Sequence, residues 1–387
     1  MDMTDLDLNA EDIAVRDLVR QVVAREVAPL ARQVDEEERF PLEAIRTFGE
    51  LGLIGILVPK EYGGTGSTMQ QYAIVMEEIA RACGATAASF MTQVHGMLPV
   101  ILAGSEEQKK KWLPAACAGK QITAIALTEP NAGSDVAAMQ TLALRDGDHY
   151  VINGSKIFIT NGSVADYICI FAKTDRNAKH EGISLFLVER GTPGLSYGNP
   201  LLKMGIRGSN TAELFFTDMR VPAANRLGPE GNGFGIAMGA LGDARISTAA
   251  QSVGLAQGAY DIAFNYAQER KQFGQAIYGF QAVQLMLMDM YMGVVSGRLM
   301  LYQLARMIDR KTRSEYSVES AMAKVYCSDM AMKVTTDAVQ LLGGYGYIRE
   351  YNVERFMRDA KITQIYDGTN QINRLLMARR LLKRMKD

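Results

Sequence analysis

The chain has 387 residues, 48% of them hydrophobic and 22% charged, and its formal net charge is −1. This length predicts two or three folded domains, and the near-zero charge excludes a general electrostatic attraction to nucleic acid or anionic lipid. Its apolar runs are short, as in Leu53–Pro59, so we expect no membrane span. Four scattered cysteines without a C-x-x-C pair, and three histidines in all, argue against disulfides and metal sites. The acidic start, MDMTDLDLNAED, resembles neither a signal nor a transit peptide, and we expect a cytoplasmic protein.

Residues 1–122 carry the apolar spacing of α-helices. Asn9 precedes an acidic turn, as expected of a helix N-cap, and Ala14, Leu18 and Val22 follow at helical spacing. Similar patterns recur over residues 41–52, 68–82 and 105–118. We therefore predict an N-terminal α domain over residues 1–122.

Residues 123–228 have a strand-like pattern. In TLALRDGDHYVINGSKIFITNG, Asp-Gly and Asn-Gly turn dipeptides separate short β-branched and aromatic runs. Runs of the same kind cover residues 166–173, 183–189 and 212–218. We predict a middle domain that is an antiparallel sheet or barrel, not a set of βαβ units.

Residues 229–387 are again helical in pattern. Long segments rich in Met, Ala and Leu cover residues 234–270, 280–312 and 317–342. The Met excess is typical of helical core packing. The whole chain is therefore predicted to be an α+β protein with α, β and α domains in that order.

Three glycine clusters could indicate phosphate binding, but each has a simpler interpretation. EYGGTG (61–66) lies between two helical patterns and is typical of a turn, and GPEGNGFG (228–235) is typical of a linker that starts a helix. LLGGYGYI (341–348) follows a helix, whereas a Rossmann fingerprint follows a strand. A nicotinamide-type fold is therefore disfavoured.

Other stretches carry more chemical information. ALTEPNAGSD (126–135) places hydroxyls and backbone N–H groups in a turn-rich link, which could bind a heterocycle or phosphate or could simply be a capped turn. ERKQFGQAI (269–277) and LGDAR (241–245) place basic residues on helices, where solvated surface is the alternative. QIYDGTNQINR (364–374) places an acid before a Gly-Thr turn.

Together, five stretches resemble the acyl-CoA dehydrogenase flavoprotein family: LTEPNAGSD, IFITNG, ERKQFG, QLLGGYGYIREYNVERFMRDAKI and QIYDGTNQI. They occur in order over nearly the whole chain, from VPKEYGG to the last helical pattern. The resemblance implies an N-terminal helical domain, a middle antiparallel β domain and a C-terminal four-helix bundle. It also implies FAD, an acyl-CoA thioester substrate, a homotetramer, and electron-transfer flavoprotein as the electron acceptor, with no nucleic acid or membrane partner.

The resemblance assigns roles to individual residues. Those expected to bind FAD are Ile125, Leu127, Thr128, Gly133, Ser134, Phe158, Ile159, Thr160, Arg270, Gln272, Phe273, Gln281, Gln340, Gly343, Gly344, Thr369 and Gln371. Within this set, the residues from Arg270 to Gln281 would reach the FAD of a neighbouring subunit. The residues expected at the acyl-CoA are Met91, His95, Ser134, Arg245, Tyr366 and Gly368.

The resemblance also implies that Asp367 removes the α-proton while the β-hydrogen leaves as hydride to flavin N5. The family usually has Glu here, and a subset carries the base at the position of Ala244, which has no acid. Asp243 is one helical step (about 100°) from that position and should point elsewhere. Gly242 replaces a family acid. His95, among apolar residues, is the rival base, with a structural role as its alternative.

Asp is shorter than Glu by one C–C bond, about 1.5 Å. Either the backbone compensates, or the substrate α-carbon lies closer and needs room, as a branched or ring carbon would. Asp at this position resembles family members that act on alicyclic thioesters, so the resemblance favours cyclohexane-1-carboxyl-CoA. Met91 offers no second acid for proton removal farther round a ring. The alternatives are a short- or medium-chain straight acyl-CoA, a nitroalkane-oxidase-like activity with Asp as base, and a non-catalytic relative that binds nucleic acid through the basic LLKRMKD end.

Overall fold

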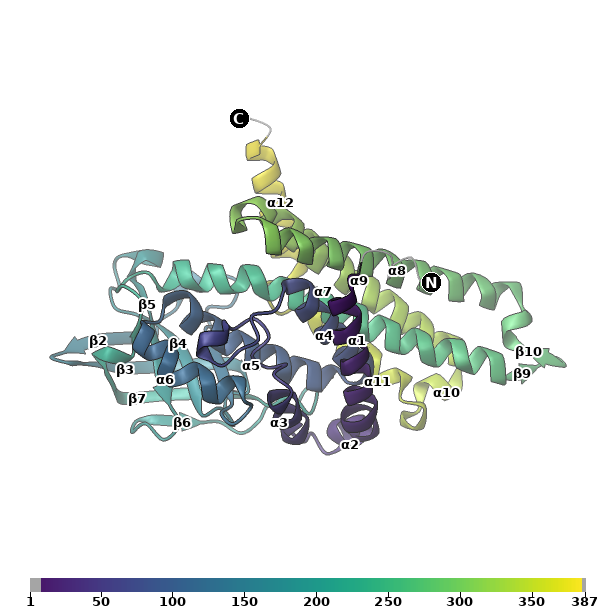
Figure 1. Ribbon diagram of the computed structural model, residues 1–387, viewed down its shortest axis with the longest axis horizontal. Helices are drawn as coiled ribbons and strands as arrows, with labels where there is room; N and C mark the ends of the chain where they lie inside the picture. The colour runs from purple at the N-terminus through teal and green to yellow at the C-terminus, as the bar shows by residue number, and fades with distance from the viewer. Residues whose placement is uncertain (1–7, 385–387) are drawn as a thin grey trace.

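The computed structural model describes residues 8–384, apart from the side chains of residues 241–243, 313–314 and 384 (Figure 1). Predictions about residues 1–7 and 385–387, and about the side chains of Gly242 and Asp243, therefore lie outside the described residues.

The N-terminal part is helical, as predicted. Its α-helices are α1 (Ala10–Val22), α2 (Ala31–Glu36), α3 (Leu42–Glu50), α4 (Met69–Ala82), α5 (Gly84–Ala103) and α6 (Glu106–Cys117). Asn9 Oδ1 accepts a hydrogen bond from the Asp12 backbone N–H at 2.9 Å, and the Asp12 carboxylate accepts one from the Asn9 N–H. This reciprocal capping box confirms the predicted N-cap.

Helix α5 corrects the expectation that no apolar stretch is long enough to span a membrane. By length and composition it could cross one, but 89% of its most apolar window is buried inside the protein. It packs against α4, α6, α7 and β1. The apolar composition of α5 is therefore explained by its place in the core.

The middle part forms one large sheet. Its strands are β1 (Thr123–Ala126), β2 (Leu142–Asp146), β3 (His149–Thr160), β4 (Tyr167–Lys173), β5 (Ile183–Glu189), β6 (Leu195–Tyr197), β7 (Thr211–Pro222) and β8 (Arg226–Leu227). The order is β6-β7-β3-β2-β4-β5-β8, and β1 pairs with β4.

The prediction of an antiparallel sheet is right for most strand pairs but not for all. β1 runs parallel to β4, and β2 meets β4 in parallel at Leu142 and Lys173. Only a hairpin forces neighbouring strands to be antiparallel, and β1 enters the sheet directly after helix α6. Its direction is therefore free to follow the packing of the helices.

The C-terminal part is dominated by long helices. Its elements are α7 (Gly233–Glu269), β9 (Lys271–Gln272), β10 (Gln275–Ala276), α8 (Gln281–Arg310), α9 (Arg313–Leu342), α10 (Gly344–Tyr347), α11 (Val353–Thr363) and α12 (Asn370–Arg384). Helices α7, α8 and α9 lie side by side, and α4 and α11 also pack on α7 (Figure 1). The predicted α, β, α fold is confirmed, while the domain limits at 122/123 and 228/229 stay predictions.

Two glycines let α7 approach α4 closely. A Cβ atom on Gly254 would lie 2.2 Å from the Glu77 carbonyl oxygen, and one on Gly258 would lie 2.3 Å from the Arg81 carbonyl oxygen. The two pairs are one helical turn apart on both helices. The backbones of α4 and α7 therefore meet over a row that tolerates no side chain.

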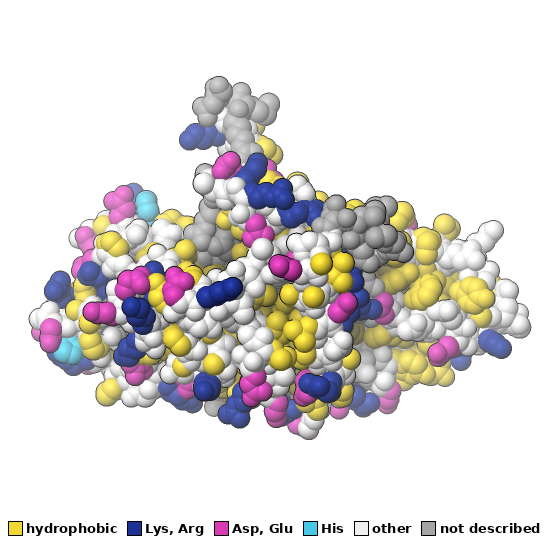
Figure 2. Space-filling model, in the orientation of Figure 1, with side chains coloured by type: hydrophobic (Ala, Val, Ile, Leu, Met, Phe, Trp, Pro, Cys, Tyr) yellow, Lys and Arg dark blue, Asp and Glu magenta, His cyan; other side chains and the backbone are white. Residues whose placement is uncertain are grey.

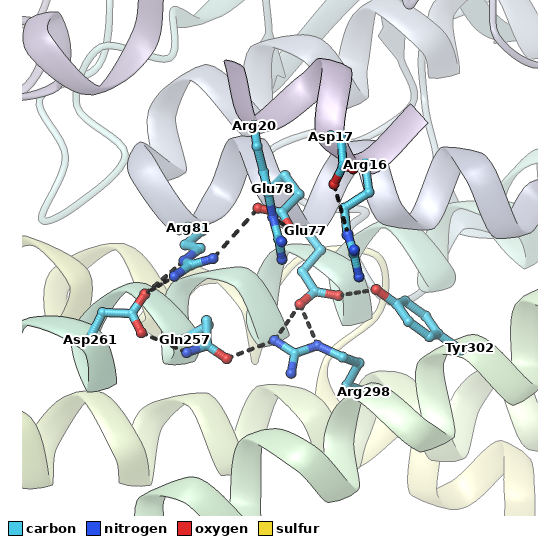
Figure 3. Close-up of polar contacts among 10 residues, drawn as sticks. All are labelled: Arg16, Asp17, Arg20, Glu77, Glu78, Arg81, Gln257, Asp261, Arg298 and Tyr302. Atoms are coloured by element: carbon cyan, nitrogen blue, oxygen red, sulfur yellow. Dashed lines mark hydrogen bonds and ion pairs between the residues drawn. The ribbon is translucent and has the colours of Figure 1, made fainter. Parts of the chain in front are cut away.

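A buried polar network holds the same helices in register (Figure 3). Glu77 on α4 accepts hydrogen bonds from Arg298 Nε on α8 at 2.7 Å and from the Tyr302 hydroxyl at 3.0 Å. Arg298 Nη2 also donates to Gln257 on α7 at 2.7 Å. A buried ion pair is costly unless its remaining polar atoms are hydrogen-bonded, so this network favours one alignment of α4, α7 and α8.

We expect Gly254→Ala to destabilise the protein, because its Cβ would overlap the Glu77 carbonyl oxygen of α4. Overpacking of this kind costs about 1–3 kcal/mol, which should lower the thermal midpoint of the holoenzyme by several degrees. Gly293→Ala on α8 is the matched control, since its Cβ would meet the flexible Met330 side chain at 3.2 Å. Equal midpoints for the two variants would contradict the role given to the α4–α7 contact.

Candidate active site

Asp367 lies in a tight loop, residues 364–370, between α11 and α12; we call it the Asp367 loop. Asp367 and Gly368 both have left-handed backbone conformations, with φ of 52° and 86°. Glycine adopts this conformation without cost, and aspartate is one of the few other residues that tolerate it. The turn directs the Asp367 side chain toward α7, where Thr248 Oγ1 donates to Asp367 Oδ2 at 2.6 Å.

One face of helix α7 lies next to the Asp367 carboxylate. Ala244 and Thr248 are one turn apart and both are buried, so the alternative base position carries a methyl group and the next turn carries a hydroxyl. Arg245 lies beside them, where burial lowers the pKa of its guanidinium and the Asp367 carboxylate acts in the opposite direction. Within the described residues, Arg245 Nε has no hydrogen-bond partner.

Tyr366, next to the acid, is fixed by its own contacts. Its hydroxyl donates to Gln251 on α7, and Gln251 Nε2 donates to the Gly84 carbonyl oxygen at 3.1 Å. Burial raises the pKa of Tyr366 well above its ordinary value, and the Asp367 carboxylate adds to this effect. Tyr366 is therefore a neutral hydrogen-bond donor.

His95 belongs to a separate polar chain. His95 Nε2 lies 3.0 Å from Ser247 Oγ, which lies 2.7 Å from the Tyr72 hydroxyl. Met91 is buried one turn before His95 on the same face of α5. These contacts favour the structural interpretation of His95 over the rival-base interpretation.

The residues expected against the flavin ring lie at the sheet. Leu127 and Thr128 follow β1, which contains Ile125, and the Thr128 carbonyl oxygen accepts from the Ile157 N–H of β3 at 2.9 Å. Lys156 Nζ donates to the Leu127 carbonyl oxygen at 3.0 Å and to Glu129 Oε1 at 2.8 Å.

The Glu129 carboxylate contacts both Lys156 and nearby backbone N–H groups. Burial raises the pKa of Glu129, but the Lys156 ammonium and hydrogen bonds outweigh burial and hold the pKa below its ordinary value. The carboxylate also accepts from the backbone N–H groups of Gln140 and Thr141. The Leu127–Thr128 segment is therefore clamped on both sides, while Gly133 and Ser134, farther along the link, are exposed.

A bulge near the end of β3 separates the next predicted residues. The register between β3 and β7 shifts between Lys156 and Ile159, and Phe158 has a φ of 60°. Phe158 is 64% exposed, whereas Ile159 is buried and Thr160 half-buried. The bulge thus turns an aromatic ring outward, as bulges beside functional sites often do.

A cavity of about 580 Å³ lies at the other end of α7. Arg270, Gln272 and Phe273 line it together with Gly343 and Gly344. A Cβ on either of these glycines would have no atom within 4 Å. The fold thus brings together two segments about 70 residues apart around an open, glycine-lined surface.

The remaining predicted residues lie at helix ends. Gln281 is exposed at the start of α8, and Gln340 is exposed in the last turn of α9, just before the glycines of the cavity. Thr369 Oγ1 accepts from the Ile372 N–H at 3.2 Å and caps α12, on which Gln371 is exposed.

The predicted FAD residues do not form one site in a single chain. Leu127 directly follows β1 and Phe158 lies in β3, whereas Arg270 and Phe273 adjoin β9 and β10, at the end of the molecule away from the sheet (Figure 1). The predicted substrate residues Arg245 and Tyr366 both adjoin Asp367.

The sequence prediction missed several residues that contact the site. They are Thr248, Ser247, Gln251, Lys156 and Lys324. Thr248 could have been predicted, because it follows Ala244 by four residues and a helix places its hydroxyl on the same face. Lys324 carries no such signal, since its partners, the Gly368 carbonyl oxygen and Asn370 Oδ1, lie far from it in the sequence.

Three acyl-CoA dehydrogenase domain families match the chain: the N-terminal domain over residues 9–120, the middle domain over 124–219 and the C-terminal domain over 231–382. Cyclohex-1-ene-1-carbonyl-CoA dehydrogenases from Geobacter metallireducens and Syntrophus aciditrophicus are 50% and 48% identical to it. Each alignment covers 97% of this chain, with 99% and 91% of the respective relatives. The structure of butyryl-CoA dehydrogenase from Megasphaera elsdenii superposes with a TM-score of 0.94 at 40% identity, covering 99% of this chain and 100% of that one.

These matches extend over the helical, sheet and C-terminal parts alike, and the chain therefore belongs to the acyl-CoA dehydrogenase family of FAD-dependent oxidoreductases that act on CH–CH bonds.

Proposed function

We propose that this acyl-CoA dehydrogenase desaturates its thioester between the α- and β-carbons, with Asp367 as the base that removes the α-proton. The observation that carries this proposal is the Asp367 loop, which directs a carboxylate toward α7 at a place where Ala244 offers no acid. Thr248 holds Oδ2, and Oδ1 can take the proton. Tyr366 and Arg245 limit the space around it.

The residues present fit FAD. Glycines 343 and 344 leave room for close approach of a ligand, and Arg270 at the same cavity supplies a cation for a pyrophosphate. Leu127, Thr128 and Phe158 would hold the ring system from the sheet. When bound, FAD supplies the acceptor for the β-hydride.

A homotetramer is part of the proposal. The two groups of FAD residues lie at opposite ends of one chain, so a neighbouring subunit would have to supply the second group (Figure 1). Apolar side chains gather on the visible surface at the end of the molecule with α8, β9 and β10 (Figure 2). Phe273 is 94% exposed and Leu285 on α8 is 68% exposed, which favours burial against another chain.

We propose electron-transfer flavoprotein as the acceptor and the cytoplasm as the location. The four cysteines are buried as free thiols, which suits a reducing compartment.

We propose an alicyclic substrate, cyclohexane-1-carboxyl-CoA. Two relatives near 50% identity are named for a cyclohexene thioester, which supports a ring in the acyl pocket. In a 1-ene, however, the α-carbon carries no hydrogen, so a base there has nothing to remove. Met91 is apolar and provides no second acid, which favours the saturated ring.

Two other substrates remain alternatives. The similarity to butyryl-CoA dehydrogenase favours a short straight chain. A nitroalkane with oxygen as acceptor would also suit an aspartate base. Initial rates with cyclic, branched and straight acyl-CoAs and a ferrocenium acceptor, compared with nitroalkanes under oxygen, discriminate among these.

Asp367→Asn should bind acyl-CoA but reduce flavin at least about a hundredfold more slowly, because it keeps the size of the side chain and removes the base. Anaerobic stopped-flow mixing measures this rate. Asp337→Asn, a change to an acid paired with Lys333 on α9, is the control. Rapid flavin reduction by Asp367→Asn would refute the base assignment and return attention to His95.

Asp367→Glu should shift the preference toward straight-chain substrates, because the longer side chain occupies the space of a ring α-carbon. One methylene in a pocket changes selectivity by about tenfold or more. The measurement is the ratio of kcat/KM for butyryl-CoA to that for cyclohexane-1-carboxyl-CoA. An unchanged ratio would reject the steric argument and leave the base assignment intact.

Arg270→Ala should lower FAD content and tetramer stability together, because the proposed cofactor site spans two subunits. FAD per chain at low flavin concentration and mass by light scattering measure both. Lys271→Ala, at the exposed neighbouring position, is the control. If FAD content is unchanged in Arg270→Ala, the cross-subunit role is wrong.

A further inference from the structure

One face of α9 lies beneath the Asp367 loop and holds its backbone. Lys324 Nζ donates to the Gly368 carbonyl oxygen at 2.9 Å and to Asn370 Oδ1 at 2.8 Å. One turn later, Ser328 Oγ accepts from Asn370 Nδ2 at 2.9 Å. Lys324 thus bridges the residue directly after Asp367 and the first residue of α12.

The next α9 side chain, Asp329, ties both ends of the loop. Asp329 Oδ1 accepts from Gln364 Nε2 at 2.6 Å and from Asn370 Nδ2 at 2.8 Å. Arg374 on α12 donates to its other oxygen. The loop is therefore held at its first and last residues by Asp329 and in its middle by Lys324.

The charged ammonium of Lys324 lies in the protein interior, where burial of a charge costs free energy. The side chain is fully buried, at 0% exposure, and a buried ammonium is expensive unless its hydrogen bonds and counter-charges are in place. Burial lowers the pKa of Lys324 to about 8, while the Asp367 carboxylate is the largest influence in the opposite direction. The other charged groups that influence it are Asp329, Arg245 and Arg374.

The backbone conformation of the Asp367 loop needs hydrogen bonds that hold it in place. Two consecutive left-handed residues make a turn that relaxes unless the surrounding contacts hold it. Asn373 Nδ2 also donates to the Gly368 carbonyl oxygen, at 2.7 Å, so two donors from different helices meet on this one atom. Loss of both hydrogen bonds would free the turn at Gly368 to change its backbone angles, and the adjoining backbone of Asp367 would then be held less firmly.

We propose that Lys324 is a positioning residue for catalysis: it holds the Gly368 carbonyl and thereby keeps the Asp367 carboxylate aimed at the substrate α-carbon. This inference rests on the proposed role of Asp367 as the base. Lys324 acts through the loop, since its hydrogen bonds go to the Gly368 carbonyl oxygen and to Asn370 Oδ1. A neutral amine is a weaker donor than an ammonium, so the hold weakens as pH rises through the lysine pKa.

The test is Lys324→Met, which keeps the length of the side chain and removes the donor. Proton removal is measured alone, as exchange of the α-hydrogen with D2O in a 3-thia-acyl-CoA, in which sulfur replaces the β-carbon and no β-hydride is available. Exchange should slow by about ten- to a hundredfold, because a misplacement of about 1 Å costs on this order. FAD content and thioester affinity should stay within about twofold.

Lys333→Met is the matched control, since Lys333 is exposed on the same helix and pairs with Asp337. It should exchange at the wild-type rate. The wild-type rate should fall above about pH 8 and that of Lys324→Met should not, because only the wild type loses an ammonium there. In an Asp367→Asn background, Lys324→Met should cause little further loss, since both changes act through the same carboxylate.

Wild-type exchange in Lys324→Met would overturn the inference, and so would a fall in rate explained entirely by lost FAD or unfolded protein. Either result would leave the base assignment standing if Asp367→Asn alone is slow. Normal exchange in Asp367→Asn would instead refute the proposed function itself.

Discussion

The close contact between α4 and α7 is the constraint on which the candidate active site depends. Gly254 and Gly258 meet the α4 backbone at Glu77 and Arg81, with no space for a side chain. Such a contact fixes both the distance between the helices and their relative rotation. The turns of α7 that precede Gly254 carry Thr248, so this crossing also determines where the hydroxyl meets the Asp367 loop.

Helix register divides the polar contacts of α7 between two neighbours. Ser247 and Thr248 are consecutive, and about 100° separates consecutive side chains on a helix. Ser247 therefore meets Tyr72 and His95, while Thr248 meets Asp367. Rotation of α7 by one residue would exchange these partners, and the buried network around Glu77 opposes such a rotation (Figure 3).

Sequence patterns predict the parts of this structure that are local. The three long C-terminal helices follow from segments rich in Met, Ala and Leu, and the N-cap of α1 follows from Asn9 before an acidic turn. The parallel pairing of β1 with β4 could not be predicted, because the residue pattern of β1 does not indicate which strand lies next to it in the sheet. Lys324 was equally hidden: a lysine inside a helix is ordinarily solvated, and only the fold places it beneath Gly368.

The same contacts bear on why the acid is the shorter aspartate. A shorter side chain could be compensated by a backbone that moves toward the substrate. Here the Gly368 carbonyl is held from α9 and from α12, and Thr248 holds Asp367 Oδ2 from α7. If Asp367 is the base, as we propose, a loop tied at these points has little freedom to advance, and the shorter reach of about 1.5 Å would leave space in front of the carboxylate. Such a space would support the proposed substrate, whose α-carbon is part of a ring and is bulkier than the α-carbon of a straight chain.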